Sequence, residues 1–232
     1  MVFQNDILAG SSGTSVSSVY KIDQSIRFNA GDSPKMNRTP SGAGNRKTWT
    51  WSAWIKRGAL STDQWLFGSF SDTSNFAAIY LDSTNNSTDN TFRVYEYNGN
   101  VLKYWVYGSQ TFRDPSAWYH FVVSFDSTNA ISSERIRLYV NGSRITDLAQ
   151  ETQPSLNYDT YINTTNEHRI GHYNNNYYMN GYMAEIHFLD GYAYDPSFFG
   201  EFNDSGIWIP KEYTGSYGTN GFKIDGRDSS DL

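Results

Sequence analysis

Two runs between residues 118 and 142 in which large apolar residues recur at every second position limit what this chain can fold into. The first run consists of Tyr119, Phe121, Val123 and Phe125. After a polar break at residues 127–133, the alternation resumes at Ile136, Leu138 and Val140. A period of two places successive side chains on opposite faces of a β-strand, and Asn141-Gly142 supplies the positive φ angles of a two-residue hairpin turn. The segment therefore predicts antiparallel strands with one buried face.

The same pattern recurs along the chain. We expect further strands at residues 25–29, 49–57, 64–70, 76–81, 92–97, 102–107, 169–171 and 182–189 and near residues 222–225. An Asn-Gly pair lies beside such a run four times, at residues 98–99, 141–142, 180–181 and 220–221, which predicts repeated hairpins. The one helix signal is Asp195-Pro196, an N-cap residue and a first helical position, and it predicts one or two turns. These features favour an antiparallel sandwich or barrel.

Composition excludes several classes of function. The 232 residues suit one sizeable β domain. A net charge of −6 with only 18 Lys and Arg argues against nucleic-acid binding. The absence of cysteine excludes disulfide scaffolds, thiolate metal sites and cysteine nucleophiles. The first residues lack a basic region and a long apolar run, and no stretch approaches the length of a membrane span, so we expect neither a signal peptide nor membrane insertion.

The composition also divides the chain into three parts. Residues 1–18 are small and polar apart from Phe3, Ile7 and Leu8, and we interpret them as an N-terminal arm that either docks these apolar residues on a neighbouring subunit or is unstructured. Residues 19–226 contain all the strand patterns and form the domain, and residues 227–232 are a C-terminal tail.

Four segments carry a resemblance to a known family. They are RTPSGAGNRKTWTWSAWIKRG at residues 38–58, FRDPSAWYHFVV at 112–123, GYMAEIHFLDGYAYDPSFFGEF at 181–202 and WIPKEYTGSYGTNGF at 208–222. Together with RLYVNG at residues 137–142 they resemble the laminin-G-like, concanavalin A-like jelly roll. The longer segments are similar to such domains in structural proteins of tailed, especially marine, bacteriophages. The resemblance implies an all-β, antiparallel two-sheet jelly-roll sandwich in a fibre, capsid decoration or other appendage of the virion.

Catalytic and metal-binding patterns are missing or weak. Glycoside hydrolases of this fold commonly present Glu-x-Asp-x-x-Glu on one strand, and the nearest segment here is Glu185-Ile186-His187, whose two polar residues we expect on a solvated face. His168 and His172 lack the helical spacing of a zinc site. Three carboxylates are candidate calcium donors without a defined spacing, and turn formation explains them better: Asp82, Asp89 and Asp126. We therefore expect no catalytic residue, no metal and no cofactor.

Two groups of residues are candidates for carbohydrate recognition. On the polar face of their strands, Trp54 and Tyr139 offer rings for stacking on a sugar, with Lys56 and Arg137 as hydrogen-bond donors. The second group is a loop with the amide and tyrosine content of a binding surface, and it contains Asn174, Asn175, Asn176, Tyr177 and Tyr178. Burial of Trp54 beneath loops, and a flexible tip at the asparagines, are the structural alternatives.

The sequence thus leaves three functions in order. The first is a non-enzymatic virion module that assembles, as an oligomer, with other capsid or tail proteins. The second is a carbohydrate-binding or receptor-binding module for a glycan on the host surface, which rests on the resemblance and the aromatic content. The third is a glycan depolymerase, which requires a second carboxylate near Glu185 in space.

Overall fold

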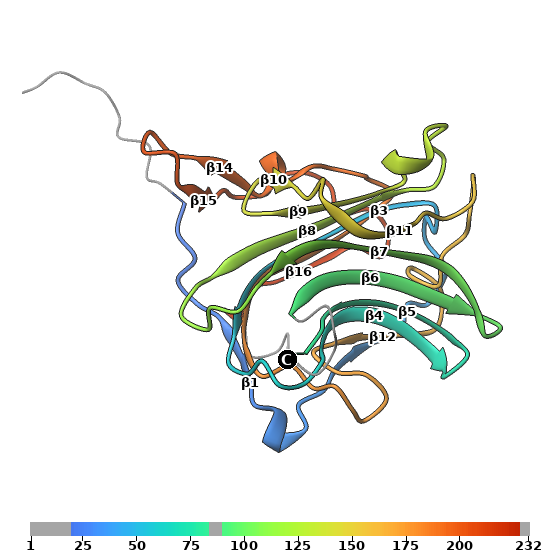
Figure 1. Ribbon diagram of the computed structural model, residues 1–232, viewed down its shortest axis with the longest axis horizontal. Coiled ribbons are helices and arrows are strands. Elements are labelled where there is room, and N and C mark those ends of the chain that lie inside the picture. Colours follow the sequence, from blue (N-terminus) through green and yellow to red (C-terminus); the bar gives the residue numbers. More distant parts are fainter. Residues whose placement is uncertain (1–19, 84–89, 228–232) are drawn as a thin grey trace, which may run out of the picture.

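Two antiparallel β-sheets packed face to face make up the protein (Figure 1). The structure is a computed structural model that describes residues 20–83 and 90–227. Sheet A contains β1 (Ile26–Phe28), β13 (Gly181–Asp190), β3 (Thr48–Arg57), β8 (Tyr119–Asp126), β9 (Ile136–Val140) and β10 (Ser143–Arg144) in that order, with β16 (Phe222–Ile224) paired to β13. Sheet B contains β11 (Leu148–Thr152), β7 (Val101–Thr111), β6 (Thr91–Asn98), β5 (Asn75–Leu81), β4 (Gln64–Asp72), β12 (Glu167–Ile170) and β2 (Met36–Arg38).

Short elements complete the fold. A separate hairpin is formed by β14 (Gly200–Phe202) and β15 (Trp208–Pro210). Three single-turn 3-10 helices are η1 (Ala30–Asp32), η2 (Ser132–Glu134) and η3 (Pro196–Phe198). The predicted helix start is confirmed at η3, where the Asp195 carboxylate accepts a hydrogen bond from the Ser197 amide at 2.8 Å. The prediction of an all-β, antiparallel two-sheet sandwich is confirmed as well.

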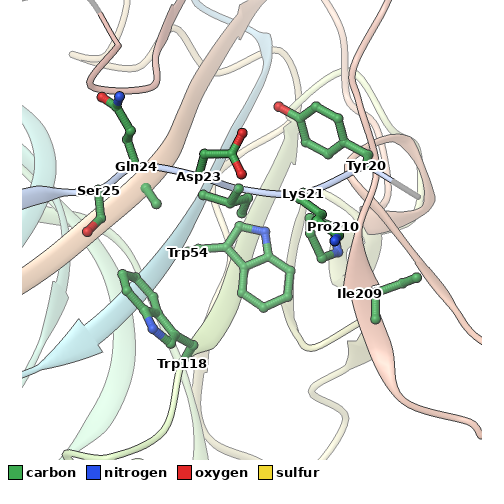
Figure 2. A pocket seen from close by; sticks show the side chains of 11 residues that line it. Tyr20, Lys21, Asp23, Gln24, Ser25, Trp54, Trp118, Ile209 and Pro210 are labelled. Carbon is green, nitrogen blue, oxygen red and sulfur yellow. The ribbon is translucent and has the colours of Figure 1, made fainter. Parts of the chain in front are cut away.

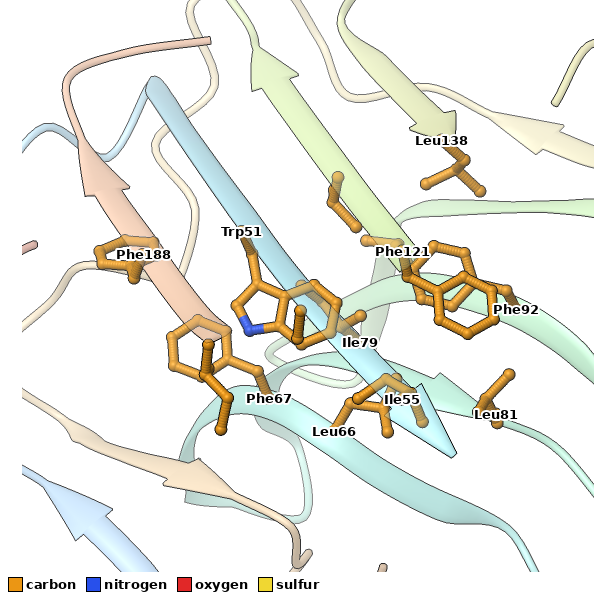
Figure 3. Close-up of a cluster of buried hydrophobic side chains, with 14 of the residues drawn as sticks. Trp51, Ile55, Leu66, Phe67, Ile79, Leu81, Phe92, Phe121, Leu138 and Phe188 are labelled. Atoms are coloured by element: carbon orange, nitrogen blue, oxygen red, sulfur yellow. The ribbon is translucent and has the colours of Figure 1, made fainter. Parts of the chain in front are cut away.

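The hydrophobic core lies between the two sheets (Figure 3). The alternate residues of β3 that face inward are fully buried: Trp49, Trp51, Ala53 and Ile55. Trp49 stacks on Phe125 of β8 with ring centroids 4.9 Å apart and planes within 2°. Phe67 of β4 reaches across from sheet B to Phe188 of β13 at 5.4 Å. Because the two sheets meet through large aromatic rings, apolar burial supplies the main stabilisation that a chain without disulfides needs.

Two of the four Asn-Gly pairs form hairpin turns. Asn141 and Gly142 both have positive φ, +46° and +79°, and connect β9 to β10. Asn98-Gly99 lies at the turn between β6 and β7, with Gly99 at φ +61°.

The other two pairs are not hairpin turns. Gly181 opens β13, and a Cβ there would lie 2.1 Å from the Lys56 carbonyl oxygen. A Cβ on Gly221 would lie 1.9 Å from the Tyr217 carbonyl oxygen. At these positions glycine permits the backbones to approach closely. The prediction of a turn beside each run was therefore wrong for residues 180–181 and 220–221.

A buried polar cluster joins distant segments at one end of β13. The two oxygens of the Asp190 carboxylate accept hydrogen bonds from the Asn45 amide (2.8 Å), the Asn163 side chain (2.6 Å) and the Asn220 amide (3.0 Å). The Asn220 side chain donates in turn to the Gly42 carbonyl and to Asn163, both at 2.9 Å. We call Asn45, Asn163, Asp190 and Asn220 the Asp190 cluster. Because it removes a carboxylate from water, each of these donors is needed to offset the cost of burial.

We expect Asp190→Ala to lower the free energy of unfolding by about 3 kcal/mol, because it leaves several buried donors without an acceptor. Urea denaturation at neutral pH measures the change. Asp114→Ala is the matched control, since this exposed carboxylate bonds to Ser116 and Ala117 within its own turn. Equal losses in the two variants would contradict the assigned role of the cluster.

Glu96 of β6 is a second buried carboxylate, and it lies between the sheets. It accepts hydrogen bonds from the hydroxyls of Tyr104 (3.0 Å) and Tyr158 (2.6 Å) and from the Tyr161 amide (2.9 Å). These bonds favour the ionised form, but burial opposes it more strongly and raises the pKa of Glu96 to about 7.

The raised pKa makes stability depend on pH. Above pH 4.5 the unfolded chain releases the Glu96 proton, whereas the folded protein holds it until about pH 7. The free energy of unfolding therefore falls between these values, by at most about 3 kcal/mol, and changes no further above them. We expect Glu96→Gln to remove this fall, because glutamine is neutral throughout. Urea denaturation at pH 5 and pH 8 measures it in both proteins, and an identical pH dependence would disprove the assignment.

Candidate functional site

An aromatic groove lies on the outer face of sheet A (Figure 2). Its volume is about 530 Å³, and it is lined by Tyr20, Lys21, Ile22, Asp23, Gln24, Ser25, Trp54, Trp118, Ala184, Ile209 and Pro210. One wall is the segment before β1, residues 20–25, and the other includes two residues of β15. We call this feature the Trp54 groove.

Strand register positions the two indoles. Trp54 of β3 lies opposite Ala184 of β13 on one side and His120 of β8 on the other. The indole stacks on the His120 imidazole at 4.9 Å, and the small Ala184 leaves space beside it. Trp118, just before β8, is 37% exposed and lies 6.4 Å from the ring of Tyr182. Two rings are therefore held by sheet residues at the surface of one hollow.

Polar side chains surround these rings. Lys21, Asp23, Gln24 and Ser25 come from the segment that forms one wall of the groove. One cation and one anion are present, so their charges cancel, and the amide and hydroxyl groups add neutral donors and acceptors. A concave, mainly apolar surface with a few convergent polar groups is the usual form of a small-molecule site. The arrangement suits a ligand with apolar faces and many hydroxyl groups.

The structure separates the four sheet residues that we expected to act together. Lys56 shares the outer face of β3 with Trp54 and pairs with Tyr182 in the register, so it lies near the groove. Arg137 instead donates to the Ser124 hydroxyl at 2.8 Å and the Ala193 carbonyl at 3.2 Å. Tyr139 is 8% exposed.

Tyr139 lines a different groove of about 500 Å³ with Trp208, Phe202 and Arg144. Alternation identified the face of each strand, but it cannot tell which parts of that face a later segment covers. Trp118 was not among the predicted recognition residues. Its position two residues before His120, on the face opposite Tyr119 and Phe121, was the available signal. The contribution of residues 20–25 had no signal in the sequence.

The predicted recognition loop forms a tight turn on the side of sheet B. The Tyr173 and Asn176 backbones exchange hydrogen bonds of 2.9 and 2.8 Å, and Tyr177 O accepts from the Trp65 amide of β4. Asn174, Asn175, Asn176 and Tyr177 are exposed, and Tyr178 is half-buried. With Ala30, Ser61, Thr62, Asp63 and Ser83, residues 176–178 line a hollow of about 470 Å³. This loop and Trp54 therefore belong to separate sites.

Glu185 and His187 do not line a solvated face, so that expectation was wrong. They are 4% and 2% exposed, because a bulge after Ala184 turns Glu185 to φ +47° and the C-terminal segment packs over His187. Glu185 lies 3.2 Å from both His187 Nε2 and Lys223 Nζ, and His187 Nδ1 lies 2.8 Å from the Tyr217 hydroxyl. Burial opposes ionisation, but the hydrogen bond from His187 and the charge of Lys223 lower the pKa of Glu185 to about 2. Because Glu185 and His187 are buried and bonded to other residues of the fold, their role is structural.

The other candidate ligands also have partners in the fold. His168 accepts a hydrogen bond from the Asn163 amide at 2.8 Å, and burial lowers its pKa to about 4. Asp82 is paired with Arg93, and Asp126 caps its own turn through Thr128. Asp89 lies outside the described residues. Within residues 20–83 and 90–227, no group of three or more histidine or carboxylate side chains is arranged to hold a metal ion.

Two further expectations concern assembly and membranes. The arm residues Phe3, Ile7 and Leu8 lie outside the described residues. In the part of the chain that the structure describes, no helix has the length and apolar character required to cross a membrane.

Comparison with known proteins places these features in a family. Residues 23–194 match the family model described as the concanavalin A-like lectin/glucanases superfamily. No curated protein sequence matches the chain. Domain 4 of AbnA, an extracellular arabinanase from Geobacillus stearothermophilus solved with arabinotriose, is similar in fold. It is 17% identical with a TM-score of 0.54, over 77% of this chain and 75% of that domain.

Two other solved structures extend this similarity. A proposed carbohydrate-binding protein from Bacteroides ovatus is 13% identical with a TM-score of 0.57, over 88% of this chain and 52% of that protein. Tailspike protein 2 of Escherichia coli O157:H7 bacteriophage CAB120 is 12% identical with a TM-score of 0.50, over 72% of this chain and 22% of that protein. At these identities the similarity establishes a shared fold.

Proposed function

The chain belongs to the concanavalin A-like lectin/glucanase superfamily, and from this premise we propose that it is a non-catalytic carbohydrate-binding module. The observation that carries the proposal is the Trp54 groove, in which Trp54 and Trp118 lie beside a wall of polar side chains. Sugar rings present C–H faces that stack on indoles, while their hydroxyls bond to amide, hydroxyl and charged groups. The arabinotriose bound by the similar Geobacillus domain supports a saccharide as the ligand class.

The groove favours a neutral glycan. Its lining carries one lysine and one aspartate, Lys21 and Asp23, so no net charge selects an acidic sugar. Gln24 and Ser25 provide the remaining polar groups of the wall. We therefore propose recognition by stacking and neutral hydrogen bonds.

We expect Trp118→Ala and Trp54→Ala each to weaken glycan binding by about tenfold, or about 1.4 kcal/mol, because each removes a stacking ring. Isothermal titration calorimetry with arabinotriose, and a glycan array of neutral plant and bacterial polysaccharides, measure the loss. Phe202→Ala is the control, since this ring is 56% exposed but lies outside the groove.

Two results would contradict the proposal. Binding that is unchanged in both groove variants would exclude the Trp54 groove as the site. New reducing ends after incubation of the bound polysaccharide with the protein would show a depolymerase instead of a binding module.

A location on a bacteriophage particle is the second part of the proposal. It rests on the resemblance of residues 38–58, 112–123, 181–202 and 208–222 to segments of phage structural proteins. The fold similarity to one part of a phage tailspike is consistent with it. In this setting the domain is an exposed, oligomeric fibre, appendage or capsid decoration module that contacts a glycan on the host surface, and residues 1–18 attach it to capsid or tail proteins.

We expect deletion of residues 1–18 to abolish incorporation into particles while leaving the isolated domain folded, because Phe3, Ile7 and Leu8 are the proposed contacts. Mass spectrometry of purified particles measures incorporation, and circular dichroism checks the fold of the shortened protein. The triple substitution of these three residues by Ser is the matched variant. Undiminished incorporation of both variants would disprove attachment through the arm.

A further inference from the structure

The outer face of sheet B carries a continuous array of aromatic side chains. The strand registers place them on four neighbouring strands: Trp105 on β7, Tyr95 and Tyr97 on β6, Phe76 and Tyr80 on β5, and Trp65 and Phe70 on β4. Tyr95 lies at the centre, with its ring 5.1 Å from Tyr80, 5.3 Å from Phe76 and 6.0 Å from Tyr97, and it pairs with Trp105 in the register. We call these seven residues the aromatic face.

The aromatic face is only partly covered. Tyr80, Tyr95, Tyr97 and Trp105 are half-buried. Among the described residues, two further rings pack on this face: Tyr107 of β7 lies 5.4 Å from Trp105, and Tyr173 lies within 5.4 Å of Trp65, Phe70 and Phe76. On sheet A, by contrast, the segment from Tyr192 to Tyr217 buries the part of the outer face around Val122, Tyr139 and Leu189. Sheet B thus has large, partly exposed aromatic rings on its outer face, and these rings are not part of the core between the sheets.

Tyr173 connects this face to the loop of residues 173–178. Its ring lies 5.9 Å from that of Tyr177, which is 49% exposed. Asn174, Asn175 and Asn176 are exposed beside these rings and offer both amide donors and carbonyl acceptors. Aromatic face and loop therefore form one surface, with stacking platforms on the sheet and exposed amides at its edge.

Three donors at this surface lack an acceptor among the described residues. Two of them are the buried indole nitrogens of Trp65 and Trp105. The guanidinium of Arg169 on β12 lies 4.1 Å over the Phe70 ring, and its Nη1 is also buried without an acceptor. Buried donors without acceptors are uncommon in folded proteins and call for an explanation. A ligand with many hydroxyl oxygens supplies acceptors at such positions.

We propose that the aromatic face and the loop of residues 173–178 bind an elongated, uncharged glycan chain that crosses the strands of sheet B. Neighbouring strands are about 4.8 Å apart, which is close to the length of one sugar unit in an extended polysaccharide. Rings on successive strands, such as Trp105, Tyr95 and Tyr80, can therefore stack on successive sugars. The inference deepens the proposed carbohydrate-binding function and rests on it, but it assigns a second surface on the opposite sheet.

The test uses the whole chain and linear cello-, xylo- and arabino-oligosaccharides from one sugar to six. We expect affinity to rise with chain length, and Trp105→Ala and Tyr177→Ala each to weaken hexasaccharide binding by about tenfold. Trp118→Ala, in the Trp54 groove, is the matched control and retains the dependence on chain length. Tyr177 is exposed, so its variant remains informative if Trp105→Ala fails to fold. Trp105→Phe keeps a stacking ring but lacks the indole N–H, and it is expected to restore part of the binding.

Nuclear magnetic resonance of the indole N–H groups identifies the surface directly. Shifts of the Trp105 and Trp65 signals on addition of a hexasaccharide support the inference. Shifts confined to Trp54 and Trp118 would overturn it and leave the proposed function intact, whereas no shift with any saccharide would count against both. Concentration-dependent dimerisation that Trp105→Ala abolishes would assign the aromatic face to a second copy of the chain.

Discussion

The buried carboxylate of Asp190 is the constraint on which the outer layer of sheet A depends. Its oxygens need several donors to offset the loss of water, and the donors come from residues far apart in the sequence. Asp190 ends β13, and Asn220 lies just before β16. The segment between them therefore begins and ends beside the Asp190 carboxylate. The Asp190 amide also donates a hydrogen bond to the Tyr217 carbonyl. Both ends of a long covering segment are fixed by one side chain.

This covering segment determines which part of sheet A remains accessible. Its aromatic residues pack on Val122, Tyr139 and Leu189 and on the two histidines of the outer face. Its β15 residues Ile209 and Pro210 lie beside Trp54 without covering it, so they form a wall of the groove. At the other end of β3, the buried Arg57 donates to the Asn90 side chain and to two backbone carbonyls. The strand that carries Trp54 is thus held by polar contacts at both ends.

The sequence predicts the strands well and the assembly of sites poorly, for one physical reason. A period of two is a local property, so the inner rings of β3 and the Asn141-Gly142 turn were correct. Which segment covers an outer face depends on non-local contacts such as those of Asp190, so Arg137 was placed in a site although it is held beneath the chain. The bulge at Glu185 also escapes pattern analysis, because a shift of one residue changes the face of every later side chain. Short strands such as β2 and β10 have too few residues to show alternation.

The two unusual carboxylates argue for binding over hydrolysis. A glycosidase needs a general acid whose pKa is raised and which can reach the sugar, together with a second carboxylate on the other side of the bond. Of the two unusual carboxylates, Glu185 lies nearer the Trp54 groove, since it hydrogen-bonds to Tyr20 in the groove wall, but its pKa is lowered to about 2, so it holds no proton to donate at neutral pH. Glu96 has the raised pKa, about 7, yet it is fully buried between the sheets and bonded to Tyr104 and Tyr158. Neither carboxylate therefore combines the protonation state with the access that bond cleavage requires, whereas stacking and hydrogen bonding in the groove require neither.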